Sequence, residues 1–206
     1  MYVLIENNEI TKYFNHPKGF TLGENQYSAD LFMKWSVAEK EAIGIYEVVF
    51  DDSNKKDEKW YINTNQTFAF ANDTVTASYG TATAKAHADS NAVDEDGNNI
   101  LDEDGNQVIN YGLKTTLIKT LKSQVAGILN DTDWYITRNS EKSTAIPSAI
   151  STHRDAVRTK QASMETAITN AADTAALETL YTYVNTGTES NPVIARPLGE
   201  LPVLES

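Results

Sequence analysis

Residues 113–183 read LKTTLIKTLKSQVAGILNDTDWYITRNSEKSTAIPSAISTHRDAVRTKQASMETAITNAADTAALETLYTY, and this stretch decides the fold of the C-terminal half. Apolar side chains recur at helical spacing from Leu113 to Ile128, and a second helical stripe runs from Ile150 to Ile168. A compact link separates the stripes, and its Pro147 fits the first turn of the second helix. Two amphipathic helices with a short link predict a helical hairpin.

Polar residues predict where these helices end. Asn130 and Asp131 end the first helix, and Asp173 caps a short third helix that carries Leu177 and Leu180. Residues 186–206 hold three of the five prolines and two glycines, which predicts an extended tail that is ordered only where it lies on something. The sequence therefore predicts a helical module at 113–185 and an extended tail at 186–206.

The N-terminal half has the pattern of a small, mostly β unit. Strands are predicted at 2–5 and 10–14 with a turn at Asn7-Asn8, and Ser36 with Glu39 forms a capping-box pattern that begins a helix ending at Gly44. The stretch between Pro17 and that helix shows no regular pattern. Further strands are predicted at 45–50, 60–62, 67–70 and 74–79. The fold class is α+β, with a mostly β unit at 1–80 before the helical hairpin.

An acidic linker at 81–112 carries an internal repeat. The sequence Asp94–Asn98 (DEDGN) recurs as Asp102–Asn106, and Asp-Gly predicts two turns that join three short strands. A calcium loop of the EF-hand type needs glycine at position 6 and glutamate at position 12. Counted from Asp94, the glycine falls at position 4 and Gly105 falls at position 12, so turn formation is favoured over calcium binding and no metal site is predicted.

Composition excludes several classes of function. The chain of 206 residues has a net charge of −12, which argues against nucleic acid as its partner. The absence of cysteine excludes disulfides and thiolate chemistry. Residues 1–10 lack the pattern of a signal peptide, and no apolar run is long enough to span a membrane, so a cytoplasmic place of synthesis is expected.

Two pairs of residues in the helical segment stand out as candidates. Trp134 and Arg138 are four residues apart, which fits a cation–π contact. Arg154 and Arg158 have the same spacing and would share one face of a helix. Asp131 or Asp133 can pair with Arg138 or Arg154 across the link. These residues form either an interaction surface or a staple that sets the angle between the helices, and the staple is favoured. Pro192, Pro197 and Pro202 complete the set of candidate partner-binding residues.

Enzymatic patterns are sparse. His16, His87 and His153 lie in unrelated contexts, and the sequence lacks a nucleophile elbow, a phosphate-binding loop and a zinc-protease motif. The chain is therefore expected to be non-enzymatic, without catalytic residues, metals or cofactors.

A resemblance rests on Thr132–Arg138, Ala145-Ile146-Pro147 and His153–Arg158. Over about 70 residues this segment resembles phage tail assembly chaperones and tail fibre assembly proteins, which show T-D-W-x-x-x-R, then a-I-P, then Y-R-x-x-V-R. His153 departs from the pattern, because a tyrosine is frequent there. No site residue carries over from the family.

The resemblance implies a structural protein of a phage virion tail, made in the host cytoplasm, which docks or joins a fibre, adaptor or baseplate within a symmetric assembly. The helices are expected to offer an apolar stripe to that partner, and order in the tail is expected to require a partner that holds it. One alternative is an assembly chaperone absent from the mature virion. Another is a carbohydrate-binding tip, for which Trp60, Tyr61 and Tyr79 would lie exposed on one face.

Overall fold

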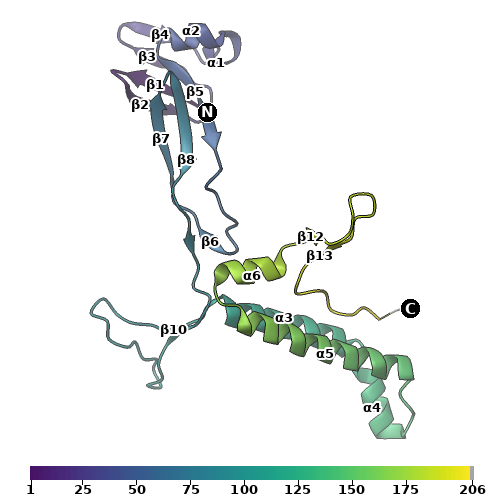
Figure 1. Cartoon of the computed structure of the whole chain (residues 1–206). Coiled ribbons are helices and arrows are strands. Elements are labelled where there is room, and N and C mark those ends of the chain that lie inside the picture. Colours follow the sequence, from purple (N-terminus) through teal and green to yellow (C-terminus); the bar gives the residue numbers. More distant parts are fainter. Residues whose placement is uncertain (205–206) are drawn as a thin grey trace. The chain divides into compact units, whose positions relative to one another are not determined.

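The computed structural model describes residues 1–204, and the chain forms two compact units. The first unit is Met1–Thr83, and the second begins at Ala84. Figure 1 shows strands in the first unit and the long helices in the second. The α+β fold class is confirmed, with a β sheet followed by helices.

The first unit is built on a five-stranded sheet with the order β2-β1-β5-β8-β7. All neighbours are antiparallel except β5 and β8, which pair in parallel. The β1–β2 turn at Asn7 and Asn8 has φ values of 54° and 65°, as its Asn-Asn sequence predicts. The strands are β1 (Tyr2–Glu6), β2 (Glu9–Phe14), β5 (Ile45–Asp51), β7 (Gln66–Ala71) and β8 (Thr74–Tyr79).

The sheet curls so that side chains of its two edge strands meet. Tyr13 of β2 and Phe68 of β7 lie edge to face, with their ring centroids 5.1 Å apart. Val3, Val75 and Ala77 are buried inside this curve. Burial of alternate residues along the strands therefore supplies one of the two cores of the unit.

The stretch predicted to be irregular, between Pro17 and the capping box, is instead ordered. It forms a second hairpin, β3 (Phe20–Leu22) and β4 (Asn25–Tyr27), followed by the short helix α1 (Leu31–Lys34). The prediction of an irregular stretch was wrong because the order here comes from distant aromatic contacts. Phe20 and Phe32 lie 4.9 Å and 5.1 Å from the ring of Phe14 on β2.

Local signals in the rest of the first unit predict the structure well. The capping box at α2 (Val37–Glu41) is confirmed, because Ser36 Oγ accepts from Glu39 N and the Glu39 carboxylate accepts from Ser36 N. Gly44 has φ of 81°, and an added Cβ would lie 2.5 Å from Ile5 O, so only glycine fits there. The remaining short strands are β6 (Tyr61–Ile62) and β9 (Thr83–Ala84).

The DEDGN repeat belongs to a three-way junction at residues 90–110. Ala92 N–H donates to Val108 O, Val108 N–H to Ile100 O and Ile100 N–H to Ala92 O, at 2.8–2.9 Å, which closes a ring of three hydrogen bonds. These residues are eight apart, so Gln107–Asn110 is a partial third copy of the repeat that the sequence reading missed. The junction joins a stem, β10 (Ser90–Asn91) with β11 (Ile109–Asn110), to two lobes closed by the bridges Val93–Asn99 and Leu101–Gln107.

Each lobe is a turn closed by its own first aspartate. Asp102 Oδ1 accepts from the N–H groups of Asp104 and Asn106 at 3.0 and 2.8 Å, and Gly105 adopts φ of 81°. Asp94 plays the same part in the first lobe. The turn prediction is thus confirmed. The three predicted short strands are reduced to two single β-bridges and a stem of two residue pairs.

Replacing Asp102 by alanine should make the amides of Asp104 and Asn106 exchange roughly fivefold faster, because both lose their acceptor. Hydrogen exchange measured by NMR checks this. Glu103→Ala is the matched control, since within residues 1–204 the Glu103 carboxylate accepts no hydrogen bond. Equal acceleration in both variants would contradict the role given to Asp102.

The first turn of α3 (Leu113–Asn130) is held by the segment that precedes the junction. Leu113 N–H donates to Ala86 O, and the Asp89 carboxylate accepts from Gly112 N–H and from Thr115 Oγ1 at 2.8 Å. These bonds satisfy groups that a helix start leaves open. The 81–112 segment is therefore joined to the helical module by specific hydrogen bonds.

Helices α3 and α5 (Ser148–Asn170) lie side by side in Figure 1 and form the predicted hairpin. The link between them is not simply a turn, because it contains the helix α4 (Asp133–Lys142). Asp173 caps α6 (Thr174–Tyr181) as predicted, by accepting from Ala176 N–H. The stripes that were expected to face a partner are buried: Leu117, Leu121, Val125, Ile150, Val157, Met164 and Ile168.

The tail is partly folded rather than simply extended. Val184–Asn185 (β12) and Ile194–Ala195 (β13) pair as an antiparallel hairpin, and Leu198 is buried, with its N–H donating to Leu180 O of α6. The chain's own helix α6 therefore contributes contacts that order the tail. Among residues 1–204, no helix is long and apolar enough to cross a membrane.

Candidate protein-interaction surface

Arg154 connects three helices. Its guanidinium donates to Leu129 O at the end of α3, to Thr132 Oγ1 and to Asp133 Oδ1 at the start of α4, at 2.7, 2.6 and 2.8 Å. Arg154 and Thr132 are buried, whereas Asp133 is exposed, so the bonds to the carbonyl and hydroxyl matter more than the ion pair. The favoured interpretation of Arg154 as a staple is consistent with this geometry, and Asp133 is its partner rather than Asp131.

Trp134 and Arg138 meet on α4, as their spacing predicts. The guanidinium carbon of Arg138 lies 4.6 Å from the Trp134 ring centroid and 5.4 Å from that of Tyr135. Trp134 is 51% exposed and Ile136 is 41% exposed. Since the stack leaves much of the indole open, α4 offers an aromatic and apolar surface at the end of the hairpin.

The other candidate residues do not join this surface. Arg158 is exposed on α5 and pairs with Asp155 at 3.4 Å. Pro192 and Pro197 are exposed in the tail, and only Pro202 lies against the helices. The seven residues named from the sequence are thus spread over several places instead of forming one site.

A polar clamp fixes the tail near the end of α6. Arg196 lies between the rings of Tyr181 and Tyr183, at 5.4 and 5.5 Å, and donates to the Glu200 carboxylate at 2.7 Å. Tyr183 Oη donates to the same carboxylate at 2.6 Å. The hydrogen bond from Tyr183 is the main cause that lowers the pKa of Glu200 below its ordinary 4.5, and the bond from Arg196 adds to it.

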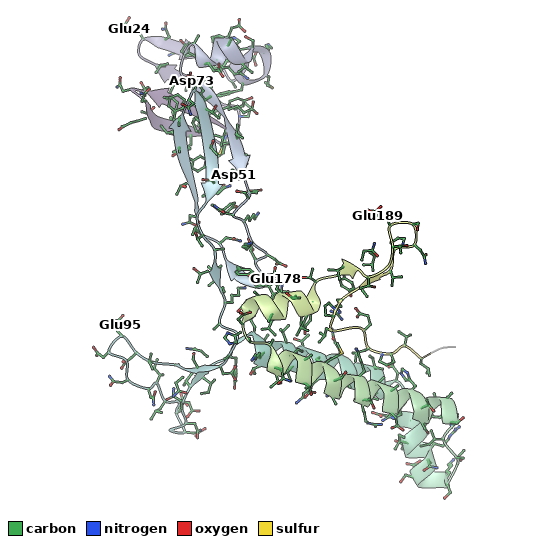
Figure 2. All side chains as sticks on the ribbon, in the orientation of Figure 1. Glu24, Asp51, Asp73, Glu95, Glu178 and Glu189 are labelled. Carbon is green, nitrogen blue, oxygen red and sulfur yellow. The ribbon has the colours of Figure 1, made fainter. Side chains whose placement is uncertain are left out.

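The tail should therefore become less ordered as the pH falls into the acid range. A carboxylate whose pKa is lower in the folded state stabilises that state above pH 4.5, and the stabilisation is lost as the pH falls through the folded pKa. Amide protection factors of Leu198 and Gly199 should fall between about pH 5 and pH 3. Glu200→Gln should remove this pH dependence, and Glu189→Gln, in the loop tip labelled in Figure 2, should not.

The lobes of the junction are acidic but already hydrogen-bonded internally. Figure 2 shows Glu95 at a loop end, and hydrogen bonds from Asn98 and Asn106 chiefly hold the pKa values of Asp94 and Asp102 below their ordinary range. In the part of the chain that the structure describes, no three His, Asp or Glu residues lie close enough to hold a metal ion.

An aromatic platform for carbohydrate is not formed by the three residues considered for it. Trp60 is 3% exposed, and Tyr61 and Tyr79 are half-buried. Stacking of a sugar needs an open ring face, so the described geometry gives this alternative no support.

A groove beside His153 was missed by the sequence reading. Two adjoining cavities of about 280 and 450 Å³ flank the segment Leu201–Leu204. His153 and Pro202 line both cavities, with Ile128, Asp131 and Thr132 on one side and Ser148, Ala149, Thr152 and Ala156 on the other. No local sequence pattern marks this groove, because its lining comes from separate segments of the chain.

Known proteins add no assignment to this geometry. Comparison with protein-family models, curated proteins and solved structures finds no match for this chain.

Proposed function

We propose that this chain is a non-enzymatic structural protein of a phage tail, which docks or joins a fibre, adaptor or baseplate component. The observation that supports this most directly is the meeting of the motif residues at α4. Asp133 binds Arg154 and Trp134 stacks on Arg138, while Trp134 and Ile136 stay exposed. A braced helix with an open aromatic side chain is typical of a protein-interaction surface.

The proposal places the chain in the assembled particle, within a symmetric arrangement and without nucleic acid or membrane as partner. Mass spectrometry of purified particles, from a phage whose genome encodes this chain, tests it. A structural part should be present in a fixed copy number. Absence from mature particles, with presence in infected cells, would favour the assembly chaperone instead.

A variant at α4 tests whether this surface carries the role. Trp134→Ser should reduce incorporation into particles while the isolated protein keeps its stability, because the indole is half exposed. Arg158→Ser, on an exposed part of α5, is the control. Normal incorporation of the Trp134 variant would mean that another surface makes the contact.

A further inference from the structure

The first unit contains a charged side chain that is buried without a counter-ion. Lys40 on α2 is 7% exposed, and its ammonium lies 4.8 Å from the ring centroid of Tyr2. Its one hydrogen bond among residues 1–204 goes to Tyr2 Oη at a long 3.4 Å, and no carboxylate in that range lies close enough to form an ion pair. Buried lysines are almost always paired, because an uncompensated buried charge is costly. An ammonium with two donors to spare therefore indicates a missing anionic partner.

Lys40 lines a cavity of about 180 Å³ that α2 forms with β1, β5 and the turn before β8. Val37, Ile45 and Val49 give this cavity an apolar wall. Pockets that hold drug-sized molecules are considerably larger, so the space suits only a small molecule. We call this cavity the Lys40 pocket.

Three carboxylates line the same pocket, from Glu41, Glu47 and Asp73, the last at the turn between β7 and β8 and labelled in Figure 2. In the part of the chain that the structure describes, none of the three accepts a hydrogen bond or forms an ion pair. Burial raises the pKa of Tyr46, and the carboxylates of Asp73 and Glu41 raise it further, so both lie within electrostatic reach of its hydroxyl. The pocket thus combines one cation, several carboxylates and an apolar wall.

We propose that the Lys40 pocket binds a small zwitterion, namely an α-amino acid with a short aliphatic side chain. Its carboxylate accepts from the Lys40 ammonium, and its amino group faces the carboxylates of Glu41 and Asp73. Its aliphatic side chain packs against Val37 and Val49. A simple anion would be repelled by the three carboxylates and a simple cation by Lys40, so a molecule that carries both charges suits the lining best.

The proposal goes beyond the phage-tail role, because it concerns a small molecule and a pocket within the first unit. The probe is L-valine, added to the isotope-labelled full chain and followed by NMR. The chemical shifts of the Val49 and Thr74 amides should change saturably, with a dissociation constant in the millimolar range. Valinamide lacks the carboxylate and isovalerate lacks the amino group, so each should bind at least about tenfold more weakly.

Matched variants assign the two charges. Lys40→Met keeps the apolar stem, and it should weaken valine about tenfold while leaving valinamide binding unchanged. Asp73→Asn should weaken valine about threefold without weakening isovalerate, and asparagine tolerates the φ of 55° at this position. Lys34→Met is the control and should change none of these affinities, because Lys34 is exposed on α1 and pairs with Asp30.

Any of three results would overturn the proposal. The first is the absence of saturable shifts with L-valine, and the second is equal affinity of the wild-type chain for valine and valinamide. The third is equal weakening of both ligands by Lys40→Met, which would mean that the lysine only supports the fold. The comparison of valine with valinamide needs no variant, so it decides even where Lys40→Met fails to fold. Absence of the chain from phage particles would leave these results standing.

Discussion

Replacing Arg154 by methionine should lower the free energy of unfolding of the helical module by about 3 kcal/mol. Methionine keeps much of the apolar stem but cannot donate, so the two hydrogen bonds that join Arg154 to Leu129 O and to the buried Thr132 hydroxyl are lost. Urea unfolding followed by far-UV circular dichroism measures the loss. Most of that signal comes from α3 and α5, the two helices that Arg154 helps to join.

Arg158→Met is the matched control, because it removes the same group four residues further along α5. Arg158 pairs with Asp155 at an exposed position, so the loss should stay within about 0.5 kcal/mol. Arg154→Lys should give an intermediate loss, since a single ammonium cannot reproduce the planar donor set. Equal losses for the Arg154→Met and Arg158→Met variants would show that Arg154 is not a staple.

Replacing Phe14 by alanine should lower the free energy of unfolding of the first unit by about 4 kcal/mol. Phe14 is 1% exposed and its ring contacts those of Phe20 and Phe32, so the change leaves a cavity and removes two aromatic contacts. Hydrogen exchange of β1, β2 and β3 reports this loss, and α3 and α5 serve as an internal reference.

Tyr13→Ala is the control on the neighbouring residue. Tyr13 is 46% exposed and, among the described residues, its ring contacts that of Phe68, so its loss should be about 1 kcal/mol. A loss for Phe14→Ala no larger than this would mean that the aromatic cluster does not hold the second hairpin in place.

Elements with local causes were predicted well. The Asn7-Asn8 turn, the Ser36–Glu39 capping box, the cap at Asp173 and the Asp-Gly turns all form as their residues indicate. The long helices follow the apolar stripes closely. In each case the bonds or the spacing lie within a few residues of the chain, which is the range over which sequence patterns are informative.

Elements with distant causes were not predicted. The hairpin β3–β4 depends on Phe14. The tail is ordered by the bond from Arg196 to Glu200 and by Leu198, whose N–H donates to Leu180 O of α6. The helix α4 sits within a stretch that reads as a link, and its start is braced by Arg154 on α5. These contacts join residues far apart in the chain, so no local pattern announces them.

The candidate site shows the same division. Spacing alone predicts the contact of Trp134 with Arg138, because i and i+4 share a helix face. The groove beside His153 and the three-way junction exist only once separate segments meet. The groove needs α3, α5 and Leu201–Leu204, and the junction needs two copies and a partial third copy of an eight-residue pattern. Short-range hydrogen bonds and helical periodicity depend on neighbouring residues, so the sequence determines them directly. A surface built from several segments forms only when tertiary packing brings together residues that are distant in the sequence.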